Sequence, residues 1–201
     1  MTRMRLYLSA LVSLLVTACA AGPADDGAST TVALACTPQQ DPTDRISPYD
    51  SVSLSSGPLQ AKLCYGRPSS RGRTMLGGEL VPYGQLWRTG ANEPTTLHLA
   101  TAAEIAGIRV EPGSYSIYTV PDEDAWEVIV NRSTSQWGHE STYTEEVAAQ
   151  EVGRARVVRE DLAEHLETFT ISAVELDAGV ADLVLEWETT RVVIPVQVVE
   201  D

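Results

Sequence analysis

The sequence predicts an all-β protein, an antiparallel β-sandwich that is jelly-roll-like and carries one or two short helices. Three observations lead to this fold class. Apolar and polar residues alternate with a period of two after about residue 47. Turn-forming pairs such as Pro112-Gly113 separate the alternating runs, and few stretches show helical periodicity. Such alternation is typical of strands with one buried face, and many short strands joined by turns are typical of sandwiches.

The expected elements follow from this pattern in chain order. In the run ETFTISA, Phe169, Ile171 and Ala173 share one face and polar residues occupy the other. Pro195 lies in the last run and donates no ladder hydrogen bond, which predicts an edge position for that strand. Strands are expected at residues 51–55, 59–66, 95–101, 107–111, 114–120, 126–132, 154–160, 167–176, 181–188 and 191–199, and short helices near residues 143–151 and 159–165.

The N-terminus has the features of an export signal. Arg3 and Arg5 precede an apolar run over residues 6–16, which is too short to span a bilayer. Residues 1–18 are therefore expected to be a signal peptide.

The signal ends in the tetrapeptide VTAC, which resembles the lipobox of bacterial lipoproteins. In a lipobox the cysteine, here Cys19, is lipidated and becomes the mature N-terminus. The alternative is an ordinary secretory signal that is cut elsewhere. Ala20, in place of an aspartate after the cysteine, favours the outer membrane. The expected location is the bacterial cell envelope, with the periplasmic or surface side left open.

A stretch without sustained periodicity follows the signal. Residues 19–46 are rich in Ala, Gly, Pro, Asp, Ser and Thr and are expected to form a flexible tether, which leaves residues 47–201 as one β-sandwich domain. The whole chain carries a formal net charge of −14. Because so acidic a surface repels nucleic acid, no nucleic-acid partner is expected, and contact with the membrane is expected through the lipid anchor.

Two cysteines remain after Cys19, and an exported protein can join them. Cys64 shares the polar face of its expected strand with Gln60 and Lys62, so we expect it to be exposed and within reach of Cys36. A disulfide and two separate thiols are both compatible with the sequence. Neither the cysteines nor the scattered histidines have metal-ligand spacing, so no metal or cofactor is expected. By the same alternation, His98 is expected at the surface.

The candidate functional residues lie in a stretch enriched in arginine and aromatic residues. Arginine suits carboxylates and phosphates, and aromatic rings suit sugars, so residues 67–93 could form a pocket for a glycan or an anion. A structural role is the alternative, in which Arg88 and Glu93 pair within the loop and Trp87 fills the core. The candidate ligand-binding residues are Arg67, Tyr83, Trp87, Arg88, Asn92 and Glu93, beside Arg71 and Arg73.

These segments also carry a family resemblance. The runs GRPSSRGRTMLGG, LVPYGQLWRTGANEPTTL, PGSYSIYTVPDEDAWEVIVNR, SQWG and ADLVLEWETTRVVIPV together resemble a bacterial family of exported proteins, domain of unknown function 2911, over residues 47–196. The resemblance implies an exported, β-rich protein and implies no reaction. Residues 140–151 depart from the family pattern, because they are longer or more helical here.

The sequence favours a protein of unknown molecular function that binds without catalysis. Its expected ligand is a glycan, a carboxylate or phosphate compound, or an envelope partner. The alternative is a hydrolase of envelope polysaccharide or peptidoglycan with Glu93 as the acid and Glu79, Asp122 or Glu140 as a second carboxylate. The chain has no G-x-S-x-G elbow and no P-loop lysine, which excludes these two signatures of hydrolases and nucleotide-binding proteins.

Overall fold

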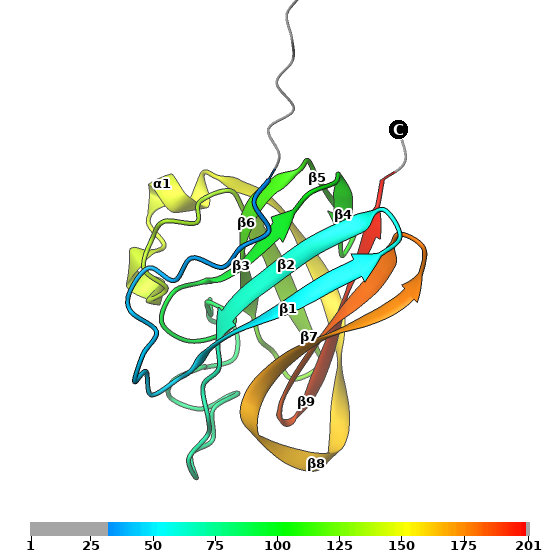
Figure 1. Ribbon diagram of the computed structural model, residues 1–201. Coiled ribbons are helices and arrows are strands. Elements are labelled where there is room, and N and C mark those ends of the chain that lie inside the picture. Colours follow the sequence, from blue (N-terminus) through cyan, green and yellow to red (C-terminus); the bar gives the residue numbers. More distant parts are fainter. Residues whose placement is uncertain (1–31, 200–201) are drawn as a thin grey trace, which may run out of the picture. The chain divides into compact units, whose positions relative to one another are not determined.

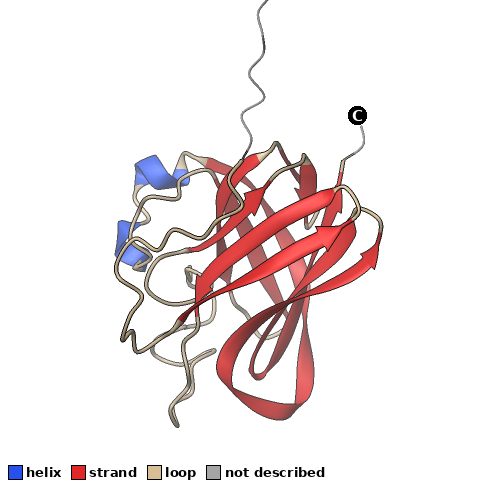
Figure 2. Cartoon of the chain, in the orientation of Figure 1, coloured by secondary structure: helices blue, strands red, loops and turns tan. Residues whose placement is uncertain are grey.

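The computed structural model describes residues 32–199, so the predicted signal peptide, the lipidation of Cys19 and the first part of the predicted tether lie outside the described residues. In the described part no helix combines the length and the apolar character that crossing a membrane requires. The strands are β1 (Tyr49–Ser56), β2 (Leu59–Gly66), β3 (Thr95–Leu99), β4 (Ala103–Ile105), β5 (Ile108–Val110), β6 (Gly113–Val120), β7 (Ala125–Asn131), β8 (Glu151–Asp177) and β9 (Val180–Val198), with a 3-10 helix at Glu140–Thr142 and the short helix α1 at Glu145–Ala148 (Figures 1 and 2).

All strand pairs are antiparallel, and the strand order is β1-β2-β3-β6-β7-β8-β9-β4-β5. The prediction of an all-β antiparallel fold with short helices is therefore confirmed. Most neighbours in the sheet are also neighbours in sequence. The exception is the β4–β5 hairpin, which leaves β3, pairs with β9 and returns the chain to β6 beside β3.

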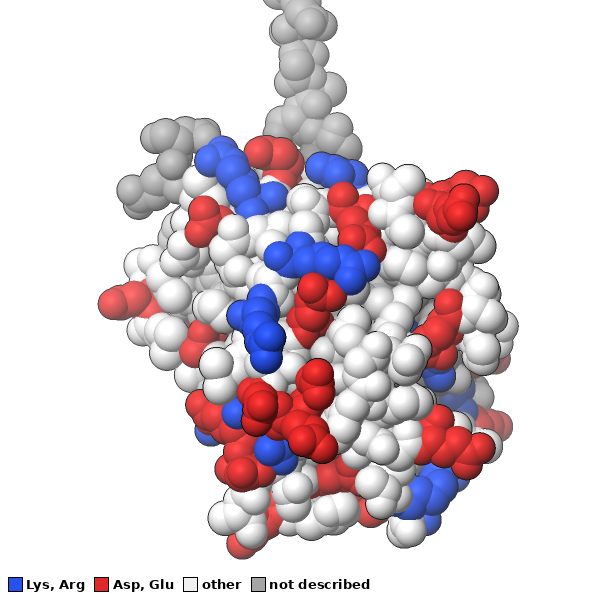
Figure 3. Space-filling view, turned by 180° about the vertical axis from the view of Figure 1, so that it is seen from behind, with Lys and Arg blue, Asp and Glu red and all other residues white. Residues whose placement is uncertain are grey.

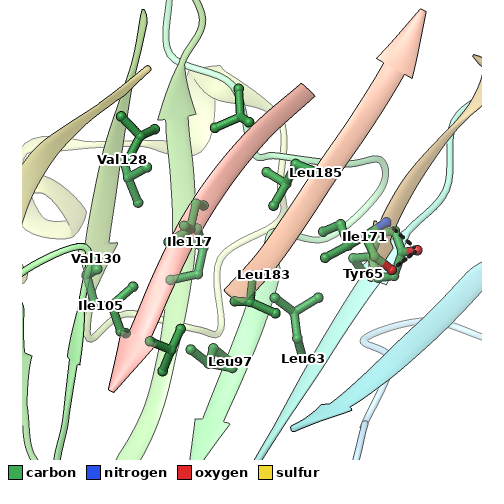
Figure 4. Packing of buried hydrophobic residues seen from close by; sticks show 14 of the residues in the cluster. Leu63, Tyr65, Leu97, Ile105, Ile117, Val128, Val130, Ile171, Leu183 and Leu185 are labelled. Atoms are coloured by element: carbon green, nitrogen blue, oxygen red, sulfur yellow. Dashed lines mark hydrogen bonds between the residues drawn. The ribbon is translucent and has the colours of Figure 1, made fainter. Parts of the chain in front are cut away.

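The sheet folds over a core because the long strand β8 pairs with strands of both halves of the sheet. Residues 151–158 of β8 pair with β7, whereas residues 159–177 pair with β9. Figure 1 shows this long strand, yellow to orange, curving around the lower end of the domain. Apolar residues from both halves then face one another, as Leu63, Leu97 and Ile117 do with Leu183 and Leu185 in Figure 4.

The elements differ from the expectation in four respects. Residues 159–165 continue β8 instead of forming a helix, because register shifts between Asp161 and Thr170 absorb the break in alternation within a continuous strand. β4, a three-residue strand, was not expected. Pro195 lies in an interior strand, between Val192, which pairs with β8, and Val196, which pairs with β4. The expected strands at 181–188 and 191–199 form the single strand β9.

The N-terminal segment, residues 32–47, covers part of the sheet. Cys36 and Cys64 form a disulfide with a Cα–Cα distance of 5.7 Å. Gln39 donates its backbone N–H to Glu93 at 3.1 Å and its side-chain amide to the carbonyls of Thr134 and Gln136. The end of the predicted tether is thus held against the domain.

This cover corrects two expectations about exposure. Cys64 is only 1% exposed and His98 is buried, although both lie on the strand faces that point away from the core. Burial lowers the pKa of His98, whose Nδ1 lies 2.7 Å from the hydroxyl of Ser114. The alternation identified the outer face correctly, but the residues that cover it come from elsewhere in the chain.

Charged side chains of both signs lie next to one another on the surface. On the face shown in Figure 3, basic residues are surrounded by acidic ones. Exposed ion pairs of this kind include Arg154 with Glu127 and Glu151, each at 2.7 Å. Such pairs add little to stability because water screens them.

Candidate functional site

The described residues form a cleft of 690 Å³. This volume is typical of sites for small ligands. The cleft lies where the long loop between β2 and β3 meets the 3-10 helix and β9. Its lining includes Arg73, Glu79, Gln85, Trp87, Arg88, His139, Glu140 and Trp187. Of the six predicted ligand-binding residues, Trp87 and Arg88 line it.

Trp87 and Trp187 contribute their indoles to the cleft wall. The two rings stack at 5.7 Å with an interplanar angle of 20°, and the Trp87 Nε1–H donates to the carbonyl of Gly90 at 3.1 Å. Trp87 also meets Trp126 and Phe169 edge-on. Because Trp87 is only 3% exposed, it offers a ligand little open ring face and mainly fixes the shape of the cleft.

Arg88 forms the main ion pair of the cleft. Its Nη1 donates to both carboxylate oxygens of Glu140, at 3.0 and 3.2 Å, and to the carbonyl of Gly138 at 3.2 Å. The Arg88 Nε is buried and has no hydrogen-bond partner among the described residues. The expected pair of Arg88 with Glu93 is wrong, because the SQWG segment brings Glu140 to Arg88 instead.

Gly138 is what allows this approach. A Cβ atom on residue 138 would lie 2.1 Å from the carbonyl oxygen of Asn92 and 2.5 Å from the Cδ of Arg88. Any larger residue would push the 139–140 segment away from the Arg88 loop. The sequence motif SQWG therefore marks a close contact between two parts of the cleft.

Two further polar residues, Glu79 and Gln85, line the cleft. No hydrogen bond or ion pair of the Glu79 carboxylate or the Gln85 amide is found in the described part of the chain, and both residues are exposed. They are therefore available to a ligand. Gln85, His139 and Trp187 were not predicted as site residues. His139 and Trp187 are distant from Arg88 in sequence, and Gln85 has neither the charge nor the aromatic ring by which the candidates were chosen.

The other predicted residues hold the structure together outside the cleft. Arg67, which directly follows β2, pairs with Asp50 of β1 at 3.2 Å and donates to the hydroxyl of Thr170 of β8 at 3.0 Å. Asn92 donates to the carbonyl of Ser47 at 3.3 Å. Tyr83 packs against the core and lines a different hollow.

Glu93 belongs to a buried ion pair. Its Oε2 lies 2.7 Å from Nη1 of Arg45, and the two side chains are 4% and 9% exposed. The Arg45 guanidinium also lies over the ring of Tyr49, at 5.5 Å from its centroid. Burial and the nearby Glu93 raise the pKa of Tyr49 to about 12. With its oxygens bonded to Arg45 and to Gln39, Glu93 has a structural role, which does not favour the hydrolase alternative.

Comparison with known proteins identifies the family of this chain. Residues 47–196 match the model of the family described as "Protein of unknown function (DUF2911)". The chain belongs to this family. No curated protein and no solved structure matches it. The DUF2911 region contains every residue that lines the cleft, whereas Cys36 and Arg45 lie before it.

Proposed function

We propose that this DUF2911 protein is an exported, lipid-anchored envelope protein that binds a glycan in the cleft without turning it over. The observation that carries the proposal is the Arg88–Glu140 pair in a 690 Å³ cleft, beside the free side chains of Glu79 and Gln85. Guanidinium, carboxylate and amide groups together offer both donors and acceptors. Sugar hydroxyls need both.

The charge state of the cleft supports a neutral ligand. Glu140 already compensates Arg88, since it accepts two hydrogen bonds from Nη1. Glu79 adds a negative charge and Arg73 a positive one. An anion would therefore compete with Glu140 for Arg88, whereas a polyhydroxylated ligand could bond to the pair without separating it.

The binding test uses Glu79 and Gln85, whose side chains have no hydrogen bond or ion pair in the described part of the chain. Thermal unfolding of the purified full chain is followed against neutral glycans, peptidoglycan fragments and inorganic anions. A glycan at about 100 times its dissociation constant should add roughly 2.7 kcal/mol and raise the midpoint by about 5–10 °C. Gln85→Ala and Glu79→Gln should reduce this shift without lowering the midpoint of the unliganded protein.

The matched control is Glu164→Gln, which makes the same change as Glu79→Gln at an exposed position of β8 outside the cleft. It should retain the full shift. A glycan shift of equal size in all three variants would place binding elsewhere. Absence of any shift across the glycans would refute the proposal, and release of a shortened glycan would show turnover.

The proposed anchor is tested separately. Cys19→Ala should move the protein from the membrane fraction to the soluble fraction of the producing cell, because a thioether-linked lipid can no longer form. Incorporation of labelled palmitate into the unaltered chain, and not into the variant, is the companion measurement. Equal membrane association of both chains would contradict lipidation at Cys19.

A further inference from the structure

A second hollow lies beside the cleft and has different chemistry. It encloses 440 Å³ between residues 70–76, β8 and residues 188–190 of β9. We call it the basic hollow and define it by six of its lining residues, which are Ser70, Arg73, Tyr83, Arg159, His165 and Thr190. Every one of these side chains can donate a hydrogen bond.

Arg73 contributes an uncompensated charge. Its Nε donates to the carbonyl of Ser70 at 2.9 Å and its Nη2 to the carbonyl of Ser69 at 3.3 Å. No carboxylate within 4.0 Å of Arg73 is found in residues 32–199. The guanidinium is thus held in place by neutral acceptors and keeps its charge for another group.

Arg159 supplies a second guanidinium from β8. Its Nε donates to the hydroxyl of Thr190 at 3.2 Å, which orients the side chain toward β9. Its Nη2 lies 2.6 Å from Asp161, but that carboxylate is 78% exposed. An ion pair so open to water is weak, and a ligand can compete with it.

The hydroxyl of Ser70 is buried and has no hydrogen-bond partner in residues 32–199. The residue is 1% exposed. Its backbone groups are occupied, since the N–H donates to Glu167 and the carbonyl accepts from Arg73. A buried hydroxyl without a partner costs free energy, so an acceptor placed in the hollow would relieve that cost.

The one carboxylate that lines the hollow is already bonded. Glu188 accepts the backbone N–H of Met75 at 2.9 Å on one oxygen and that of Leu76 at 2.8 Å on the other. These two hydrogen bonds fix the loop at residues 74–76 against β9. The hollow therefore offers many donors, and its acidic group is turned to the backbone.

We infer that the basic hollow binds the phosphate group of a small ligand. Donors come from three separate segments, which suits a tetrahedral group that accepts from several directions. Two guanidinium groups also match a group with up to two negative charges. The imidazole of His165, whose Nε2 lies 3.8 Å from Oε2 of Glu167, can donate a further hydrogen bond. A carboxylate is planar and is satisfied by a single arginine fork. The inference does not rest on the glycan cleft, although Arg73 lines both hollows.

The test titrates the purified full chain with inorganic phosphate in a calorimeter, with acetate and chloride at equal ionic strength in parallel. Saturable phosphate binding is expected, and Ser70→Ala and Arg159→Gln should each weaken it about 10-fold or more. Ser70→Ala removes only an unpartnered hydroxyl, so this variant should fold normally. Arg156→Gln is the matched control, because it changes an exposed arginine of the same strand outside the hollow, and it should bind phosphate like the parent.

Three results would overturn the inference. Acetate that binds as tightly as phosphate would show that the hollow does not select a tetrahedral group. Equal weakening by Arg156→Gln and Arg159→Gln would show general screening of the acidic chain instead of a site. No saturable binding of phosphate would exclude the site directly.

Discussion

Replacing Arg45 with alanine is expected to lower the free energy of unfolding by about 3–5 kcal/mol. The substitution leaves the carboxylate of Glu93 buried at 4% exposure with only the N–H of Gln39 as a partner. It also removes the guanidinium from the ring of Tyr49. An isolated charge in such surroundings is far more costly than a missing surface contact, since desolvation is no longer offset.

Urea unfolding of the full chain measures this loss. Arg156→Ala is the control, because Arg156 is exposed and forms no ion pair within 4.0 Å in the described part of the chain, and it should change stability by less than about 0.5 kcal/mol. The double variant Arg45→Met/Glu93→Gln removes both charges and should recover most of the loss. A loss below about 1 kcal/mol for Arg45→Ala would mean that the pair behaves as an exposed one.

Removing the disulfide is expected to cost about 3 kcal/mol. The bond joins residues 28 apart in sequence, so it restricts a loop of moderate length in the unfolded chain. For a domain of this size that corresponds to a midpoint lower by about 6–12 °C. Cys36→Ala/Cys64→Ala is the suitable variant, because neither thiol is left to react.

The same variant separates a local from a global effect. Residues 32–38 should become accessible to proteases while the exchange of β6 and β7 amides stays slow, because those strands lie in the core and pair on both sides. A midpoint unchanged within about 1 °C, or core amides that exchange as fast as those of residues 32–38, would contradict this prediction. Treating the parent protein with a reductant should reproduce the variant.

The strands could be predicted because alternation is a local property. Leu59, Ala61, Leu63 and Tyr65 are buried as their period of two requires, and the same holds for Phe169 and Ile171. What alternation cannot show is whether the outer face of a strand is covered. His98 and Cys64 were expected in water because the covering segment has no periodicity of its own.

The site could be predicted only in part, for a related reason. Composition pointed to residues 67–93, and two of the six candidate residues do line the cleft. Charge alone could not assign partners, however, since Arg88 had several acids within reach of a flexible loop. Its partner Glu140 is 52 positions away in sequence, and Arg45 reaches Glu93 over 48 positions. Such pairings are set by the packing of loops, which no short sequence window contains.

Under the proposed anchoring, the attachment of residues 32–47 to the domain limits how far the domain can lie from the lipid on Cys19. A chain spans at most about 3.5 Å per residue, so the connection from Cys19 to residue 47 could span at most about 100 Å. Because the disulfide attaches Cys36 to β2, only the chain from Cys19 to Cys36 counts, and its greatest span is about 60 Å. Reduction of the disulfide would lengthen this connection only to Gln39 and Arg45, because their contacts with Glu93 do not depend on the disulfide. Under the proposed anchoring, the greatest distance between the domain and the membrane is therefore set first by the Cys36–Cys64 disulfide and, once that bond is reduced, by the contacts of Gln39 and Arg45 with Glu93.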